Sequence, residues 1–219
     1  MSTFMKQVVL ESPKTFQFKE AEIPVPKEGE ALLKIKAVGI CGSDIHTYFG
    51  KHPFVHPPLI LGHEASGEIV SFGPGDHSGL SVGDRVVIRP QRTCGKCRPC
   101  REGRYNICEK LNVLGCLSDG ASSEYFAVET SILYKIPDYL SFAEGTVLEP
   151  LAVGVHAVKR GGNPAGKNIL VCGGGTIGNV VAQAAKGLGA KNVMITDISE
   201  FKLDLARKCG ISHTINVGK

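Results

Sequence analysis

Four cysteines in the middle of the chain have the spacing of metal ligands. Cys94, Cys97 and Cys100 are separated by two residues each, and Cys108 follows after seven more. Gaps of two residues let successive sulfurs converge without strain, and the longer gap lets the chain return to them. Four thiolates complete the tetrahedral shell that Zn²⁺ prefers and leave no position open, so we predict a structural zinc site in this segment.

Two other interpretations of this cluster are weaker. A pair of disulfides or free buried thiols is one alternative, but the eight cysteines are not spread along the chain like a disulfide framework. A zinc ribbon that binds nucleic acid would normally contain two separated cysteine pairs, and nothing else in the sequence supports one.

A second set of residues has the composition of a catalytic zinc site. Cys41 follows an apolar run, His63 and Glu64 are adjacent, and Glu149 comes much later in the chain. Individually these residues say little, because a single cysteine is more often a small packed side chain. Together they offer one thiolate, one imidazole and one or two carboxylates, which leaves a coordination position for water or a substrate oxygen.

A glycine-rich turn at residues 173–178 predicts a dinucleotide site. The sequence GGGTIG follows the short apolar run Asn168–Cys172 and opens a segment with helical periodicity, and Asp197 ends the next apolar run. A glycine pattern alone is weak evidence, but a strand, a glycine turn, a helix and an acidic residue in this order are typical of a Rossmann domain.

The residues of this turn have separate expected tasks. Gly173 permits the tight turn, Gly175 lets the backbone reach a pyrophosphate, and Gly178 allows the helix to pack closely on the strand. We expect the pyrophosphate to bind backbone N–H groups at the start of the helix, near Thr176 and Ile177.

Asp197 determines the predicted cofactor. Its carboxylate would accept hydrogen bonds from the adenosine ribose and repel a 2′-phosphate, so NAD is predicted rather than NADP. Lys202 is interpreted as a solvated helix charge rather than a ribose contact.

The elements that position these residues change in character near residue 150. Before it, short β-like runs alternate with turns rich in Gly, Pro and Asp, which predicts a β-barrel or sandwich-like domain. After it, strand and helix patterns alternate as the opening of a parallel, doubly wound sheet. We place the domains at residues 1–152 and 153–219. The expected strands are Ala31–Val38, Ala65–Val70, Arg85–Ile88, Ser122–Val128, Asn168–Cys172, Val193–Asp197 and His213–Val217, and the expected helices are Leu151–Lys159, Thr176–Leu188 and Ser199–Lys208.

The second domain is too short for a complete doubly wound fold. A sheet of two or three parallel strands with helices on both faces would leave an apolar edge bare. We therefore expect the chain to be truncated and to contain only the N-terminal part of this domain.

The composition excludes several classes of protein. Hydrophobic residues make up 42% and charged residues 21% of the chain, and the net charge is only +4. This net charge is too small to indicate binding to nucleic acid or an anionic membrane, so we expect neither as a partner. No apolar run approaches the ~20 residues of a membrane span, and the N-terminus lacks a signal-peptide pattern, so a cytoplasmic location is expected.

The sequence resembles the zinc-dependent medium-chain alcohol and polyol dehydrogenases over nearly its whole length. The matching motifs, in chain order, are GICGSDIH, GHEASG, VGDRVV, the four-cysteine segment and GGGTIG. The resemblance implies a GroES-like catalytic domain followed by a Rossmann domain, and an α+β and α/β fold class. It also implies that Cys41, His63 and Glu64 bind or face the catalytic zinc, and that Glu64 alternates with water as a ligand. Asp44 is then a residue that orients His63.

Glu149 indicates the branch of the family. Classical alcohol dehydrogenases have a cysteine ligand at this position, whereas a glutamate is typical of the sorbitol, threonine and sugar-acid dehydrogenases. We expect Glu149 to bind zinc directly or to hydrogen-bond its water.

The resemblance further implies a proton relay and a substrate loop. Ser43 would accept the proton of the substrate hydroxyl, and His46 would pass it outward through the cofactor ribose. The alternatives are a turn or cap hydroxyl for Ser43 and a surface histidine for His46. The loop Thr47–Pro58 helps shape the substrate pocket in the family. Asp76 departs from the small apolar residue that is usual at its position, which puts the local turn in doubt but not the zinc site.

We therefore predict a dehydrogenase that uses one catalytic zinc, one structural zinc and NAD to oxidise a secondary alcohol of a polyol, sugar acid or sugar phosphate. The full-length protein is expected to be a homo-oligomer, a dimer or a tetramer. The alternatives are a non-catalytic zinc-binding scaffold that lacks a complete cofactor site and a zinc-free quinone reductase, whose members lack this ligand set. The remaining cysteines, Cys116, Cys172 and Cys209, are interpreted as packed thiols without a role.

Overall fold

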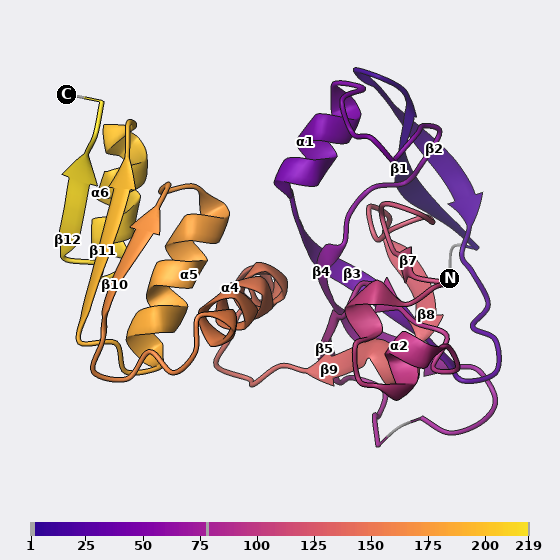
Figure 1. Ribbon diagram of the computed structural model, residues 1–219. Coiled ribbons are helices and arrows are strands. Elements are labelled where there is room, and N and C mark those ends of the chain that lie inside the picture. The colour runs from indigo at the N-terminus through magenta and orange to yellow at the C-terminus, as the bar shows by residue number, and fades with distance from the viewer. Residues whose placement is uncertain (1–2, 78, 219) are drawn as a thin grey trace. The chain divides into compact units, whose positions relative to one another are not determined.

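The computed structural model describes residues 3–77 and 79–218. The chain divides into two compact units, residues 1–147 and 148–219. The positions of the units relative to one another are not determined, so each is described by itself (Figure 1). The division comes after Val147, earlier than the expected boundary after residue 152, because the helix that contains Glu149 packs on a helix of the second unit.

The first unit is built on a five-stranded antiparallel sheet in the order β8-β3-β4-β5-β9. Its core contains Leu33, Ile69, Val86 and Val128, all fully buried. The strands of the sheet are β3 (Glu30–Gly39), β4 (Glu64–Phe72), β5 (Arg85–Ile88), β8 (Tyr125–Glu129) and β9 (Leu133–Lys135). This arrangement confirms the predicted β-rich domain.

Pairing of β3 with β4 brings the C-terminal end of β3 next to the N-terminal end of β4. The strands are antiparallel, and Gly39 at the end of β3 lies opposite Glu64 at the start of β4. Cys41 therefore follows one strand at the place where His63 precedes the other. The register of the sheet, and not proximity in sequence, makes these residues neighbours.

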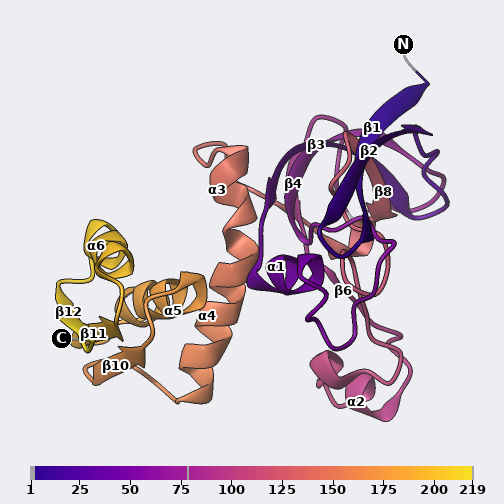
Figure 2. The same ribbon diagram turned by 90° about the horizontal axis from the view of Figure 1, so that it is seen from above.

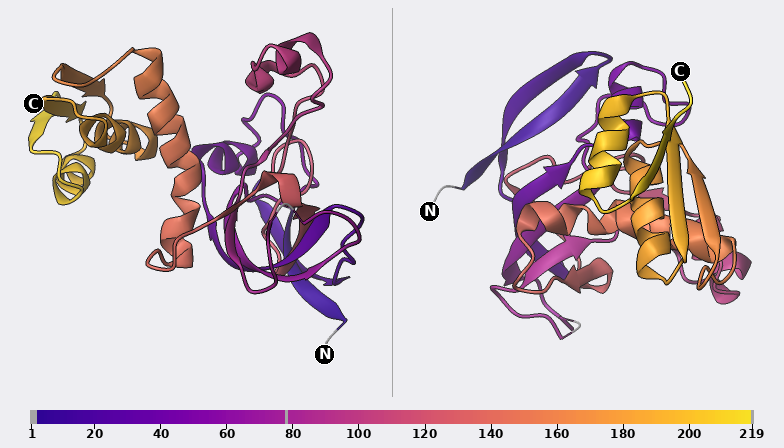
Figure 3. Two further views of the ribbon diagram at one scale, coloured as in Figure 1. Left: turned by 90° about the horizontal axis from the view of Figure 1, so that it is seen from below. Right: turned by 90° about the vertical axis from the view of Figure 1, so that its left-hand side faces the viewer.

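Two smaller sheets and several short helices complete the first unit. The cysteine segment lies in a lobe, containing α2, that extends away from the large sheet (Figure 2; Figure 3, left). These elements are β1 (Phe4–Ser12) with β2 (Thr15–Glu22), β6 (Gln91–Arg92) with β7 (Asn112–Val113), α1 (Gly42–Tyr48), α2 (Arg98–Arg101), α3 (Phe142–Thr146) and the 3₁₀ turns η1 (Tyr105–Ile107) and η2 (Thr130–Ile132).

The β1–β2 hairpin supports the end of α1. The rings of Phe16 and Tyr48 stack with their centroids 5.5 Å apart and their planes at 13°. The backbone N–H of Lys14 at the hairpin turn donates to the carbonyl oxygen of Tyr48 at 2.7 Å. The helix that begins at Cys41 is thus fixed at its far end by the N-terminal hairpin.

The second unit is a three-stranded parallel sheet in the order β10-β11-β12, side by side in Figure 3, right. Helix α5 packs on β10 and β11, α6 packs on β11 and β12, and α4 packs on α5. The elements are α4 (Leu148–Arg160), β10 (Asn168–Cys172), α5 (Thr176–Gly187), β11 (Asn192–Asp197), α6 (Glu200–Lys208) and β12 (His213–Asn216). The predicted start of a Rossmann sheet is confirmed, including its third strand.

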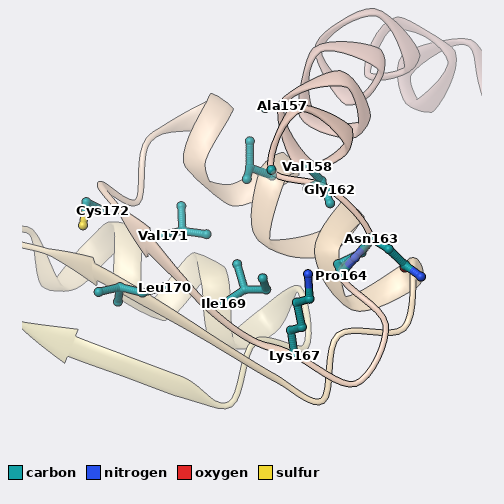
Figure 4. A pocket seen from close by; sticks show the side chains of 12 residues that line it. Ala157, Val158, Gly162, Asn163, Pro164, Lys167, Ile169, Leu170, Val171 and Cys172 are labelled. Atoms are coloured by element: carbon teal, nitrogen blue, oxygen red, sulfur yellow. The ribbon is translucent and has the colours of Figure 1, made fainter.

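Strand β10 is an edge of this sheet. A groove of about 330 Å³ runs along it between the loop 161–167 and the end of α4 (Figure 4). Leu170 is 59% exposed and Cys172 is also exposed, so the interpretation of Cys172 as a packed thiol was wrong. These residues alternate with Ile169 and Val171, which pack in the core, so Leu170 and Cys172 lie on the opposite face of the strand, which explains their exposure.

Among the described residues, no helix is both long and apolar enough to cross a membrane.

Candidate metal and dinucleotide sites

The four cysteines of the α2 lobe converge as their spacing predicts. The sulfurs of Cys94, Cys97, Cys100 and Cys108 lie within 4.8 Å of one another. The sulfurs of Cys97 and Cys108 are 3.9 Å apart, and those of Cys94 and Cys108 are 3.5 Å apart. A disulfide would require about 2.05 Å, whereas a tetrahedron with Zn–S distances of about 2.3 Å has edges of about 3.8 Å. The sulfurs therefore fit a zinc ion and not a pair of disulfides.

Backbone N–H groups already surround these sulfurs. Cys108 Sγ accepts from the N–H of Cys94 and of Lys110, both at 3.3 Å, and Cys94 Sγ accepts from the N–H of Cys97 at 3.4 Å. The N–H groups of Lys96 and then Cys97 lower the pKa of Cys94 to about 6. These N–H groups favour the thiolate form of Cys94. Burial and then the neighbouring Cys97 raise the pKa of Cys100 to about 12, so the lobe does not favour the thiolate form of all four sulfurs without a bound cation.

Cys41, His63 and Glu64 form the second group. One ligand atom of each lies within 4.8 Å of the others, and both His63 and Glu64 are buried. A thiolate, an imidazole and a carboxylate at such distances suit one Zn²⁺ ion and leave a further position for a substrate oxygen.

The carboxylate of Glu64 occupies space that exists only because residue 39 is glycine. A Cβ atom on Gly39 would lie 2.3 Å from Glu64 Oε2 and 3.0 Å from Glu64 Cβ. Strand pairing places these two residues opposite each other. Gly39 therefore lets the carboxylate turn toward Cys41 and His63.

Asp44 connects His63 to helix α1. Its Oδ2 accepts the backbone N–H of Cys41 at 2.8 Å, which caps the helix, and its Oδ1 lies 3.7 Å from His63 Nδ1. Oδ1 is buried and accepts no hydrogen bond from the described residues. This geometry supports the expectation that Asp44 orients His63.

His63 and Cys41 change each other's pKa. Burial disfavours a charged imidazole, but hydrogen bonds with Cys116 and Cys41 outweigh it and raise the pKa of His63 to about 11. The hydrogen bond with His63 in turn lowers the pKa of Cys41, although burial opposes this. A sulfur that readily becomes anionic beside an imidazole suits a metal ion, which can take the place of the shared proton.

The predicted relay residues lie on α1. After the hydrogen bond with His63, the nearby hydroxyl and backbone N–H of Ser43 also lower the pKa of Cys41, so Ser43 is close to the metal group. His46 is exposed one turn later, three residues on from Ser43 and so on the same side of the helix. A proton path through Ser43 and His46 remains a prediction.

Glu149 lies in the first turn of α4, in the second unit. Its binding to the catalytic metal remains a prediction. The substrate role of the loop Thr47–Pro58 also remains a prediction, although the loop is well organised: His52 Nδ1 accepts the N–H groups of Phe54 at 3.2 Å and Val55 at 3.1 Å.

The glycine turn of the second unit has the geometry that a dinucleotide site needs. Gly173 has a backbone angle φ of 100°, which residues with a side chain rarely adopt. A Cβ on Gly178 would lie 1.8 Å from the carbonyl oxygen of Gly173, so the helix approaches the strand as closely as predicted. A Cβ on Gly175 would meet no atom within 4 Å, and Thr176 and Ile177 begin α5 beside it. Open space in front of a helix N-terminus fits a pyrophosphate.

Asp197 holds the turn together. Its Oδ2 accepts the N–H of Gly174 at 2.7 Å and its Oδ1 accepts the N–H of Ser199 at 2.8 Å. Lys202 Nζ lies 3.5 Å from Oδ2. The Lys202 side chain is 46% exposed, so this loose ion pair is consistent with the interpretation of Lys202 as a solvated helix charge, and a ribose contact of Lys202 is not shown.

The sequence did not identify Cys116 as a neighbour of the metal group. Its Sγ lies 4.0 Å from His63 Nδ1. The two residues are far apart in the sequence, and Cys116 is not part of any recognisable metal-binding spacing.

Residues 27–138, just over half of the chain, match the family model of the alcohol dehydrogenase GroES-like domain. The sorbitol dehydrogenase of Bacillus subtilis strain 168 is 38% identical over 218 residues, which are 97% of this chain and 61% of that protein.

Solved structures agree with this match. A protein described as a zinc-binding dehydrogenase from Sinorhizobium meliloti 1021, bound to NADP, has a TM-score of 0.92 and 34% identity, with 99% of this chain and 63% of that one covered. An alcohol dehydrogenase of Escherichia coli CFT073 in complex with NADH has a TM-score of 0.89 and 36% identity, with 100% and 64% covered. The chain thus spans somewhat less than two thirds of the length of these relatives.

Proposed function

Because the chain belongs to the alcohol dehydrogenase GroES-like family, we propose that it forms the zinc-binding part and the first cofactor-binding strands of an NAD-linked dehydrogenase. The substrate is a secondary alcohol of a polyol, a sugar acid or a sugar phosphate. The group of Cys41, His63 and Glu64 with Ser43 at its edge is the observation that carries this proposal. The activity named for the Bacillus subtilis relative supports the polyol class.

In the reaction, the alcohol loses a proton and a hydride and becomes a ketone. A bound Zn²⁺ ion would polarise the hydroxyl, and NAD⁺ would accept the hydride. Cys41, His63 and Glu64 would hold the ion, and Glu149 would join them or hydrogen-bond its water. Ser43 would accept the hydroxyl proton as it releases its own, and His46 would pass the proton outward through the cofactor ribose.

The second unit would bind the cofactor through its glycine turn. The backbone N–H groups near Thr176 and Ile177 would hold the pyrophosphate, which Gly175 lets the backbone reach, and Asp197 would accept hydrogen bonds from the adenosine ribose hydroxyls. NAD is preferred to NADP because the Asp197 carboxylate repels a 2′-phosphate. The protein acts on a small molecule, in the cytoplasm, as a dimer or a tetramer.

Metal content and turnover test the proposal. The purified 219-residue chain should contain two zinc ions. The full-length protein should reduce NAD with at least one member of a panel of polyols, aldonates and sugar phosphates. A Glu149→Ala variant should lose zinc occupancy or turnover, with Glu144→Ala as the matched control from a capping glutamate outside the ligand set. Unchanged activity in Glu149→Ala would exclude that residue from the site.

The alternative is a zinc-binding scaffold without catalysis. Calorimetry with NADH on the 219-residue chain separates the two. Two bound zinc ions without heat of NADH binding would support the scaffold, and a metal-free chain would refute both proposals.

A further inference from the structure

The metal chemistry above gives no task to Cys116, although this residue lies beside a predicted ligand. Its sulfur is 4.0 Å from His63 Nδ1, at the outer limit of a hydrogen bond to sulfur. The ligand atoms that lie within 4.8 Å of one another belong to Cys41, His63 and Glu64, without Cys116. Cys116 therefore contacts one ligand and does not lie among all three.

The turn that carries Cys116 is fixed against the backbone next to His63. The N–H of Cys116 donates to the carbonyl oxygen of Val113 at 3.1 Å, and the N–H of Gly115 donates to that of Ser118 at 2.8 Å. Gly115 has φ of 71°, and a Cβ on it would lie 2.9 Å from the carbonyl carbon of Gly62. The close contact with Gly62 holds the thiol beside the imidazole.

Nδ1 of His63 thus has two neighbours of different kinds. Asp44 Oδ1 lies 3.7 Å from it, which is too far for a strong hydrogen bond, and the Cys116 sulfur lies at a similar distance. A histidine that binds a metal through one nitrogen almost always donates its other N–H to a partner that fixes the ring. Here the carboxylate alone does not complete that contact.

We propose that Cys116 is a positioning residue for His63: its sulfur accepts the Nδ1–H beside Asp44, fixes the plane of the ring, and leaves Nε2 for the metal. The inference rests on the proposed zinc site. It assigns to the thiol a task in metal binding and none in the transfer of hydride or proton.

Zinc retention by the full chain tests this assignment. Increasing concentrations of a chelator should remove the two zinc ions in separate steps. Cys116→Ala should weaken retention of one ion by about 10-fold, the lower end of the range for such partners. The ion in the four-cysteine lobe should be released as in the parent, which also shows that the variant is folded. Cys116→Ser, whose hydroxyl can accept a hydrogen bond, should recover part of the loss, and Cys209→Ala, in the other unit, should have no effect.

Cobalt substitution distinguishes positioning from direct binding. Cys116→Ala should shift the ligand-field bands of cobalt, because the ring changes its angle. The sulfur-to-cobalt charge-transfer intensity should stay unchanged, because it follows the number of bound thiolates. A fall in that intensity would make Cys116 a ligand and overturn the proposal, as would parental zinc retention in Cys116→Ala. A parent chain that binds only the lobe zinc would instead refute the proposed function.

Discussion

Replacing Gly39 by alanine tests directly whether Glu64 belongs to the catalytic metal group. The new Cβ would lie 2.3 Å from Glu64 Oε2, whereas ordinary contacts begin near 3.4 Å. The carboxylate oxygen must therefore withdraw by about 1 Å, because strand pairing fixes both backbones. Gly39 is not among the glycines with positive φ, so alanine introduces no backbone strain of its own.

A carboxylate that is turned away can no longer contact the ion. We expect Gly39→Ala to weaken retention of the catalytic zinc by about 10- to 100-fold, or about 1.4 to 2.8 kcal/mol. The zinc of the four-cysteine lobe is an internal reference in the same chelator titration. Gly187→Ala is the matched control, because a Cβ there meets no atom within 4 Å.

A double-mutant cycle identifies the cause of the loss. If Gly39→Ala acts through the carboxylate, it should have no further effect on zinc retention in a Glu64→Ala background. Parental retention in Gly39→Ala, or an additional loss on that background, would refute the assignment of Glu64.

Three further changes test other parts of the molecule. Cys108→Ser should reduce the zinc content from two ions to one and lower the free energy of unfolding by several kcal/mol, measured by metal analysis and urea denaturation. Gly178→Ala places a Cβ 1.8 Å from a backbone oxygen, so it should destabilise the second unit by about 3 kcal/mol or more and abolish NADH binding in calorimetry. The N–H groups of Ser199 and Gly174 hold the pKa of Asp197 below 3.8, so its carboxylate stabilises the fold above about pH 4 and loses this effect at lower pH. Asp197→Asn should therefore flatten the dependence of stability on pH between about 5 and 2, and an unchanged acid titration would contradict this.

The regular elements of the second unit could be predicted closely from the sequence. Strand β10 and the start of α5 lie where the sequence pattern placed them, because a short apolar run that ends at a glycine turn is distinct from the helical periodicity that follows it. The β1–β2 hairpin was not predicted, since nearly all of β2 is exposed and carries no alternating pattern of burial. Helix α1 was missed because it is short and its buried residues are the polar Asp44 and Thr47.

The ligands could be predicted from residue type and spacing, but their surroundings could not. The spacing of the four cysteines is enough to predict a zinc site, and the resemblance to the dehydrogenase family assigned Cys41, His63 and Glu64 to the catalytic zinc. The contacts of Glu64 with Gly39 and of His63 with Cys116 join segments that only the folded sheet and the turn at Gly115 bring together. Such contacts have no signature in a single sequence.

The β1–β2 hairpin contains none of the proposed metal ligands, yet the helix that carries the proposed relay residues depends on it. A helix of seven residues is not stable alone, so α1 relies on what holds its two ends. One end is capped by Asp44, and the other is anchored by the stack of Tyr48 on Phe16. Trimming the first strands, or attaching a bulky tag to them, would thus loosen Ser43 and His46 from a distance and, through the proposed relay, slow proton release while every proposed metal ligand remained in place.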